Sequence, residues 1–311
     1  MYNPPRRFSH QLSETVNIGV SERRKITTKS KHIIPSAIGD KLQMVKPVSV
    51  SVSPPDGKIV VADQEICQLI FFDKKYKFVK TVGGPGHGDG EYHVIKAVSV
   101  GVNGDIVVAD SGNNRIQVLT PSGDFTRVFG SVGKSVGQFD DITDVIVDSQ
   151  DRIYVCDAGN SRIQILDLYG NFIREFGSCG NKISDIIHPQ SVAVCPCTGN
   201  VILADTSNRR VQVFYATGQH RFTIGWTGAE ECELLEPTSV AIGPKWTILV
   251  ADPTQGRICG FTMDGTLVQE YGHHGMLDNG EQFEPRQLAI NSENGDVIVI
   301  DGLNKRVIVF N

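Results

Sequence analysis

The side chains with the clearest chemical potential in this sequence are cations, amides and histidines in segments rich in glycine, asparagine and serine. Lysine and arginine can hold phosphates, whereas asparagine, histidine and tyrosine can hydrogen-bond to unpaired bases or stack on them. Gathered on one surface, such residues could bind single-stranded RNA. The first set of candidate RNA contacts is Arg209, Lys182, His188, Lys134, Asn160 and Asn208. The second set is Lys96, His93, Asn113, Arg286 and Lys305.

Patterns for catalysis or metal binding are weak by comparison. Cys195 and Cys197 are separated by one residue, and no second cysteine pair has the spacing of a zinc site. His273 and His274 are isolated, and the sequence contains neither a phosphate-binding loop nor a serine-nucleophile elbow. We therefore expect no metal, no cofactor and no enzymatic activity in this chain.

The composition indicates where in the cell the chain is expected and which binding partners it is expected to have. The chain has 311 residues, of which 40% are hydrophobic and 21% charged, as in folded globular proteins. No segment approaches 18 consecutive apolar residues, and the N-terminus lacks the apolar run of a secretory signal, so we expect no membrane partner. Seven scattered cysteines favour a reducing, cytoplasmic location. Because the net charge is −5, RNA would need a local basic patch, and we expect no DNA partner.

The candidate residues belong to an internal repeat. Six β-rich runs each end in an aspartate, and successive aspartates are 47, 47, 48, 47 and 49 residues apart. Five residues after the aspartate, five of the six copies place an arginine, whereas the first copy has Gln68. The aspartates are Asp63, Asp110, Asp157, Asp205, Asp252 and Asp301. Turn signals divide each repeat into four short runs, which are typical of a small antiparallel sheet.

Six such units at this period predict an all-β fold, namely a six-bladed β-propeller with four-stranded antiparallel blades. The sixth unit ends one strand short at Asn311, and residues 31–39 read like the missing fourth strand. Closing the ring with this N-terminal strand would remove two unpaired sheet edges. We therefore expect a monomeric propeller over residues 26–311 and a linker over residues 1–25.

The repeat resembles the NHL repeat over about residues 31–311. The closest matches are Ser111-Gly-Asn-Asn-Arg115-Ile-Gln-Val and Ala158-Gly-Asn-Ser-Arg162-Ile-Gln-Ile, each directly after a strand that ends in aspartate. Six C-terminal copies resemble the propeller of the tripartite-motif (TRIM-NHL) proteins. That resemblance implies binding of single-stranded or stem-loop RNA on the top face, in post-transcriptional or translational repression, and a parent protein whose RING ubiquitin ligase is absent from this chain. The alternative is a docking surface for protein partners, such as ubiquitination substrates.

Recurring polar residues are expected to build the scaffold, and variable ones to confer binding. The aspartate and arginine pairs recur in nearly every blade, so we expect them to tie the top loops together. The residue before each arginine varies, as befits a site of specificity; these residues are Cys67, Asn114, Ser161, Arg209, Gly256 and Lys305. The loops predict a basic sector over blades two to four and an acidic sector over blades five and six. We expect buried plugs at Tyr92, Phe139, Leu235 and Phe283.

Overall fold

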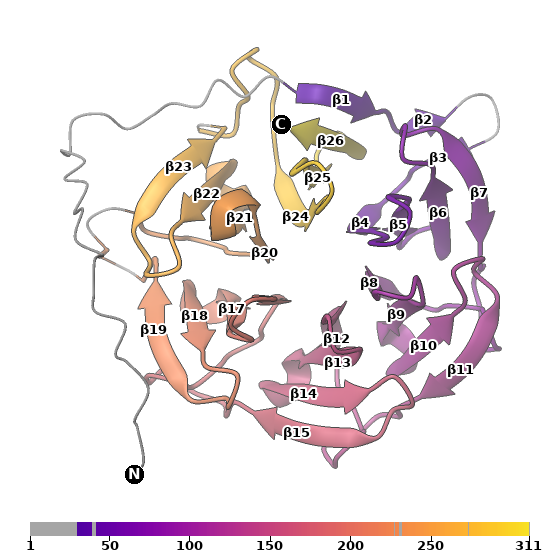
Figure 1. Ribbon diagram of the computed structural model, residues 1–311, viewed down its shortest axis with the longest axis horizontal. Coiled ribbons are helices and arrows are strands. Elements are labelled where there is room, and N and C mark those ends of the chain that lie inside the picture. The colour runs from indigo at the N-terminus through magenta and orange to yellow at the C-terminus, as the bar shows by residue number, and fades with distance from the viewer. Residues whose placement is uncertain (1–29, 39–41, 227, 230–231, 273, 311) are drawn as a thin grey trace, which may run out of the picture.

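The computed structural model describes residues 30–38, 42–226, 228–229, 232–272 and 274–310. Six four-stranded antiparallel sheets surround a central axis like the blades of a propeller (Figure 1). This arrangement confirms the predicted all-β, six-bladed fold. The predicted linker, residues 1–25, lies outside the described residues. Within the described part, no helix is long and apolar enough to span a membrane.

The strands of each blade follow one another outward from the axis. Blade 1 contains β4 (Pro47–Val52), β5 (Ile59–Asp63), β6 (Gln68–Phe72) and β7 (Phe78–Val82). Blade 2 contains β8 (Ile95–Val100), β9 (Ile106–Asp110), β10 (Arg115–Leu119) and β11 (Phe125–Phe129). Blade 3 contains β12 (Ile142–Val147), β13 (Arg152–Asp157), β14 (Arg162–Asp167) and β15 (Phe172–Phe176).

The other three blades repeat the pattern. Blade 4 contains β16 (Ser191–Val194), β17 (Val201–Asp205), β18 (Arg210–Phe214) and β19 (His220–Ile224). Blade 5 contains β20 (Ser239–Ile242), β21 (Ile248–Asp252), β22 (Arg257–Phe261) and β23 (Leu267–Tyr271). Blade 6 contains β24 (Pro285–Ile290), β25 (Val297–Asp301), β26 (Arg306–Phe310) and β1 (Ser30–Ile34). A short hairpin of β2 (Ala37–Ile38) and β3 (Leu42–Gln43) leads into blade 1.

The N-terminal strand closes the ring. β1 pairs antiparallel with β26, and Ile34 lies opposite Val307. Ile34 is buried between blades 6 and 1, and Lys31 Nζ forms an ion pair with Asp296 at 2.9 Å. Closure by the N-terminal strand is therefore confirmed, although the strand spans Ser30–Ile34 and so covers only residues 31–34 of the predicted segment. The first strand of the described chain, β1, and the last, β26, thus lie in the same blade (Figure 1).

The core lies between blades rather than within them. Six clusters of buried apolar side chains each combine residues of two neighbouring blades. Second strands such as β5 and β9 are buried at every position, because other strands flank both edges and neighbouring blades cover both faces. Plugs complete the clusters: Tyr92, Phe139 and Phe283 are buried as predicted. In blade 5 the prediction was wrong by one residue, since Leu234 is fully buried whereas Leu235 is partly exposed.

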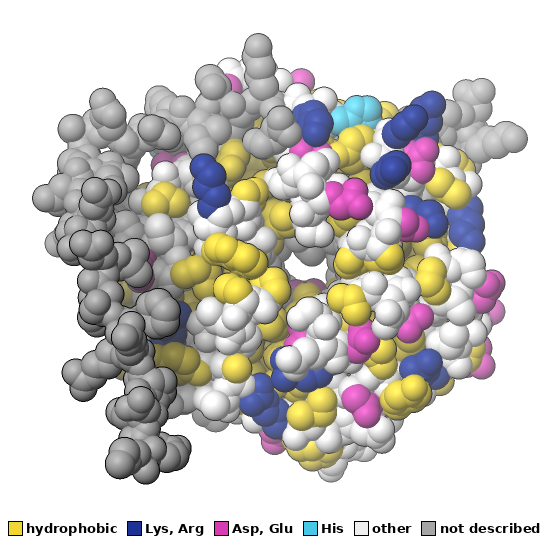
Figure 2. All heavy atoms as spheres, in the orientation of Figure 1, with side chains coloured by type: hydrophobic (Ala, Val, Ile, Leu, Met, Phe, Trp, Pro, Cys, Tyr) yellow, Lys and Arg dark blue, Asp and Glu magenta, His cyan; other side chains and the backbone are white. Residues whose placement is uncertain are grey.

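Side chains on the innermost strands join all six neighbouring blades. In each pair, a side-chain oxygen of one inner strand accepts a hydrogen bond of 2.9–3.2 Å from a backbone N–H of the next. The acceptors are Ser49, Ser99, Asp144, Ser191, Ser239 and Gln287. These bonds surround an axial cavity of about 490 Å³, whose lining includes Pro244, Lys245 and Trp246. Figure 2 shows the central opening with hydrophobic side chains beside it, while basic and acidic side chains are interspersed around it.

Asp144 is the ionisable member of this ring and should make stability depend on pH. Burial raises its pKa to about 7, against 3.8 for an ordinary aspartate, although the backbone N–H groups of Val192 and Val145 donate to the carboxyl group. The folded state therefore holds the proton more tightly than the unfolded state. The resulting stabilisation is complete below pH ~4 and is lost as the pH rises to about 7.

Asp144→Ser would copy Ser191 and Ser239 and remove the charge. We expect urea unfolding to show the variant more stable than the wild type at pH 8, by up to about 4 kcal/mol. At pH 5 the advantage should largely disappear. An equal difference in unfolding free energy at the two pH values would mean that Asp144 does not titrate in this range.

Candidate nucleic-acid interface

The top face consists of the turns between the second and third strands and the loops that join successive blades. In blades 2–5 the turn is a short 3-10 segment: Ser111–Asn113, Ala158–Asn160, Thr206–Asn208 and Pro253–Gln255. The variable residue that follows each turn has a positive φ of 50–56°, as do Cys67 and Lys305 in the other blades. Only blade 5 uses glycine there. The variable position identified in the sequence is therefore also the one at which every blade needs a left-handed backbone.

The repeated aspartate anchors each turn to the incoming loop. Asp157 is fully buried and accepts hydrogen bonds from the Asp140 N–H at 2.8 Å and from Arg162 Nε at 2.7 Å. Arg162 also donates to the carbonyls of Ser135 and Gln138, both at 3.0 Å, in the loop arriving from blade 2. The same aspartate–arginine pair forms in blades 2, 4 and 6. The predicted scaffold role is confirmed there.

Removal of Arg162 tests this role. Arg162→Ala leaves Asp157 buried without its charged partner, so we expect a loss of about 3 kcal/mol in the free energy of unfolding. Arg257→Ala is the matched control, because Arg257 forms no ion pair with Asp252 among the described residues and its Nε has no hydrogen-bond partner there. Urea denaturation should show the smaller loss for Arg257→Ala. Equal losses would show that pairing with the aspartate contributes little.

Three candidate contacts turn out to be part of the same anchor. Asn160 Nδ2 donates to Asp157 at 3.0 Å and to the carbonyl of Gly133 at 2.8 Å. Asn113 and Asn208 make the equivalent bonds in blades 2 and 4. Their constant offset of three residues from the aspartate was the available signal in the sequence. Their RNA contacts stay a prediction, since the three amide groups already donate to the anchor.

Three exposed cations lie on adjoining loops of blades 3 and 4. Lys134 lies in the loop entering blade 3, Lys182 in the loop entering blade 4, and Arg209 on the turn of blade 4. Arg210 Nη2 donates to the Lys182 carbonyl at 2.8 Å, which holds the turn and the loop side by side. None of the three cations has an ion-pair partner among the residues that the structure describes. We call Lys134, Lys182 and Arg209 the top cations.

Other candidate cations are neutralised by acidic neighbours. Lys96 and His188 converge on Asp141 from blades 2 and 4, and the His188 Nε2–Asp141 Oδ2 distance is 3.3 Å. Burial would raise the pKa of Asp141, but the hydrogen bond and charge of Lys96, with a smaller effect of His188, lower it. Arg286 pairs with Glu284 and lies 3.9 Å from Glu236, within the predicted acidic sector. Among the described residues, the surface that carries unpaired cations is therefore smaller than the basic sector predicted over blades two to four.

The two remaining candidates, His93 and Lys305, are exposed but lie on other blades than the top cations. His93 lies in the loop entering blade 2, where its ring is 5.4 Å from that of His87. Lys305 follows the turn of blade 6. In the acidic sector, Glu281 pairs with Arg306 at 2.7 Å. Glu230 and Glu231, which the sequence places in this sector, lie outside the described residues.

A basic hairpin on the face opposite the top face was not predicted from the sequence. Lys74, Lys75 and Lys77 are exposed between β6 and β7, at the end of the blade opposite the top turns. Tyr76 lies among them and stacks on His32, with ring centroids 4.9 Å apart. This hairpin provides a charge-matched control for experiments on the top cations.

Comparisons with known proteins identify the repeat. Residues 96–119, 139–166 and 187–214 match the model of the NHL repeat. The chain contains NHL repeats. The three matched segments lie in blades 2, 3 and 4, where the anchors are most regular. No curated protein sequence matches the chain, and the closer resemblance to tripartite-motif proteins remains a hypothesis.

Solved structures agree with the NHL-repeat chain in fold alone. A streptogramin B lyase has 15% identity and a TM-score of 0.62, and the match covers 90% of this chain and 96% of the lyase. An inactive virginiamycin B lyase from Staphylococcus aureus, with quinupristin, has 12% identity and a TM-score of 0.61, covering 87% and 81%. Hydrazine synthase from Kuenenia stuttgartiensis has 14% identity and a TM-score of 0.58, covering 88% and 98%.

Proposed function

We propose that this propeller binds single-stranded or stem-loop RNA on its top face, without catalysis, in post-transcriptional repression. The top cations carry the proposal, since they are exposed, lie on adjoining blades and have no acidic partner among the described residues. An RNA backbone supplies closely spaced phosphates that such cations can neutralise. The NHL repeats in blades 2–4 support a role as an interaction domain.

Phosphate contacts and base contacts have different parts in this proposal. Lys134, Lys182 and Arg209 would set the register of the strand, and their charge alone confers no sequence preference. Selectivity would come from base edges that meet the accessible variable turn residues, among them Asn114. At this position Asn114, Arg209 and Lys305 are accessible, whereas Cys67, Ser161 and Gly256 are buried, so three of the six turns can contribute a distinct contact.

Salt dependence of binding tests the proposal. We expect a pool of random RNA to yield enriched sequences, and their affinity by fluorescence anisotropy to fall with salt concentration. Three neutralised phosphates correspond to a slope of about −2 in log affinity against log salt for single strands. Absence of both enrichment and a salt-dependent shift at micromolar protein would contradict RNA binding.

One observation favours a second candidate function, the docking of a protein partner. Val132, Val136 and Ile183 are 67%, 54% and 71% exposed on the same loops that carry Lys134 and Lys182. Exposed apolar side chains beside cations suit a partner segment that is both apolar and acidic. Replacing the three apolar residues with serine separates the two functions. Binding of acidic, apolar peptides should then be lost, whereas the salt slope of RNA binding should remain.

A further inference from the structure

In blades 2–4 a buried glutamine latches the incoming top loop to the third strand. In blade 3, Gln164 Oε1 accepts from the Gly137 N–H at 3.0 Å, and its Nε2 donates to the Gln138 carbonyl at 2.6 Å. The glutamine stands seven residues after the repeated aspartate, and Gly137 stands two residues before the plug Phe139. Gln117 and Gln212 make the equivalent bonds in blades 2 and 4.

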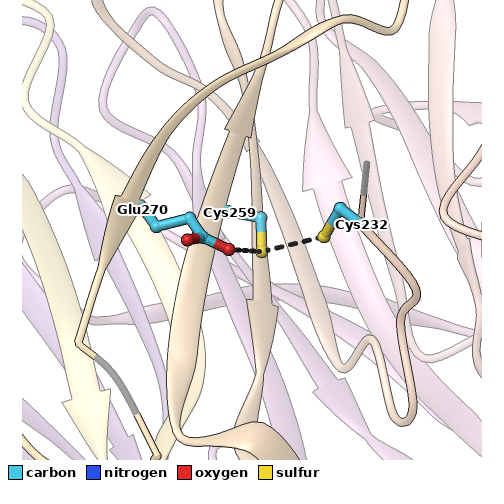
Figure 3. Close-up of side chains that lie close together, drawn as sticks. All are labelled: Cys232, Cys259 and Glu270. Atoms are coloured by element: carbon cyan, nitrogen blue, oxygen red, sulfur yellow. Dashed lines mark hydrogen bonds between the residues drawn. The ribbon is translucent and has the colours of Figure 1, made fainter. Parts of the chain in front are cut away.

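Blade 5 replaces this latch with two thiols. Cys259 stands seven residues after Asp252, in place of the glutamine, and Cys232 stands two residues before the plug Leu234, in place of Gly137. The two sulfur atoms are 3.3 Å apart (Figure 3). The contact between top loop and third strand is thus preserved, but its hydrogen-bonding groups are exchanged for a dithiol.

The surroundings make the two thiols unequal. Cys259 is fully buried, and Cys232 is 5% exposed where it lines an open pocket of about 580 Å³ on the top face, together with Arg257. The hydrogen bond from Cys259 and the charge of Arg257 lower the pKa of Cys232, although burial opposes them. The hydrogen bond with Cys232 and burial raise the pKa of Cys259. A thiol with a lowered pKa at the pocket wall, next to a second thiol with a raised pKa, is the arrangement that a reactive pair requires.

Arg257 is available for this role because, among the described residues, it forms no ion pair with Asp252, which still accepts hydrogen bonds from the N–H groups of Leu235 and Glu236. Its Nη1 pairs with Glu270 at 2.6 Å, and its Nη2 donates to the Glu233 carbonyl at 3.0 Å. Glu270 Oε1 in turn lies 4.0 Å from Cys259 Sγ (Figure 3). The guanidinium therefore bridges the loop that carries Cys232 and the strand β23, which neighbours Cys259.

We propose that Cys232 and Cys259 form a reversible disulfide on exposure to a hydroperoxide, and that this bond locks the top loop of blade 5 to β22. The Cys232 thiolate attacks the peroxide oxygen, breaks the O–O bond and becomes a sulfenic acid, while the departing oxygen takes a proton from solvent. Cys259 then attacks this sulfur, and its proton leaves with the hydroxyl as water. Two electrons pass from the dithiol to the peroxide.

Closure requires only a small movement. A disulfide bond is about 2.0 Å long, so the sulfurs must approach by about 1.3 Å. The bond would close a loop of about 27 residues, and we expect the melting temperature to rise by about 5 °C on oxidation. The inference does not depend on RNA binding, because the pair lies in blade 5 and the top cations lie on blades 3 and 4.

Peptide mapping tests the disulfide directly. The full chain is treated with hydrogen peroxide, alkylated and digested with trypsin, which separates the two cysteines at Lys245 and Arg257. We expect a Cys232–Cys259 linkage that dithiothreitol reverses. Cys232 should react at least tenfold faster than Cys179, an exposed cysteine that serves as the internal control. Cys259→Ser should trap a sulfenic acid on Cys232 that dimedone labels.

Cys259→Gln is the matched structural control, because it restores the side chain used in blades 2–4. This variant should fold and should show no rise in melting temperature with peroxide. The proposal is overturned if the folded wild type forms no Cys232–Cys259 linkage, or if Cys179 reacts as fast as Cys232. It is also overturned if the reduced protein binds one equivalent of Zn²⁺ through these thiols and Glu270 and thereby resists oxidation, since the site would then be a metal site.

Discussion

Arg209→Glu combined with Lys182→Glu should weaken RNA binding by at least tenfold. The double variant removes two phosphate contacts and adds two repulsive ones, which costs more than about 1.4 kcal/mol in a salt-dependent interface. The slope of log affinity against log salt should also become shallower by about 1.4. The melting temperature should hardly change, because exposed substitutions usually alter stability by no more than ~0.5 kcal/mol. Anisotropy titrations at several salt concentrations measure both quantities.

The basic hairpin of blade 1 provides the control. Lys74→Glu combined with Lys75→Glu changes the net charge by the same amount as the top-face double variant, but on exposed residues of the opposite face. This control should bind RNA nearly as well as the wild type. If the control loses binding and the top-face variant retains it, the RNA site has been assigned to the wrong face.

Deletion of residues 1–40 should lower the melting temperature by at least about 10 °C, since it removes a paired strand with its share of the core. β1 supplies the edge partner of β26, the buried side chain of Ile34 and the Lys31–Asp296 ion pair. Without β1, the ring ends in an unpaired edge that invites pairing with another chain. Differential scanning calorimetry measures the loss, and light scattering measures the resulting association.

Deletion of residues 1–20 is the matched truncation. It leaves Ser30–Ile34 intact, so we expect its melting temperature to stay within a few degrees of the parent. Equal melting temperatures for the two truncations would contradict closure of the ring by the N-terminal strand. A shift for the longer deletion alone would establish how much stability the closing strand contributes.

The sequence by itself determined the architecture. Aspartates at a period of 47–49 residues, with β-rich runs between turn signals, indicate one structural unit copied six times, and each copy needs neighbours to bury its two faces. The unpaired strand of the sixth copy similarly indicated closure by residues 31–39. The scaffold role of Asp157 and Arg162 could be predicted because a residue that recurs in nearly every blade does not distinguish a single site. The repeat period and the offsets of residues within a repeat are properties of the linear sequence, so they can be recognised without the structure.

Only the tertiary structure decided which polar side chains remain available. Lys96 lies in β8, whereas Asp141 and His188 lie in the loops entering blades 3 and 4, and their mutual neutralisation depends on how the ring places these elements. Cys232 and Cys259 are 27 residues apart, which is not the close spacing of a zinc-binding cysteine pair, and they meet because blade 5 folds its top loop over β22. Contacts between loops depend on the packing of neighbouring blades, and this packing is not encoded in the spacing of residues within a repeat.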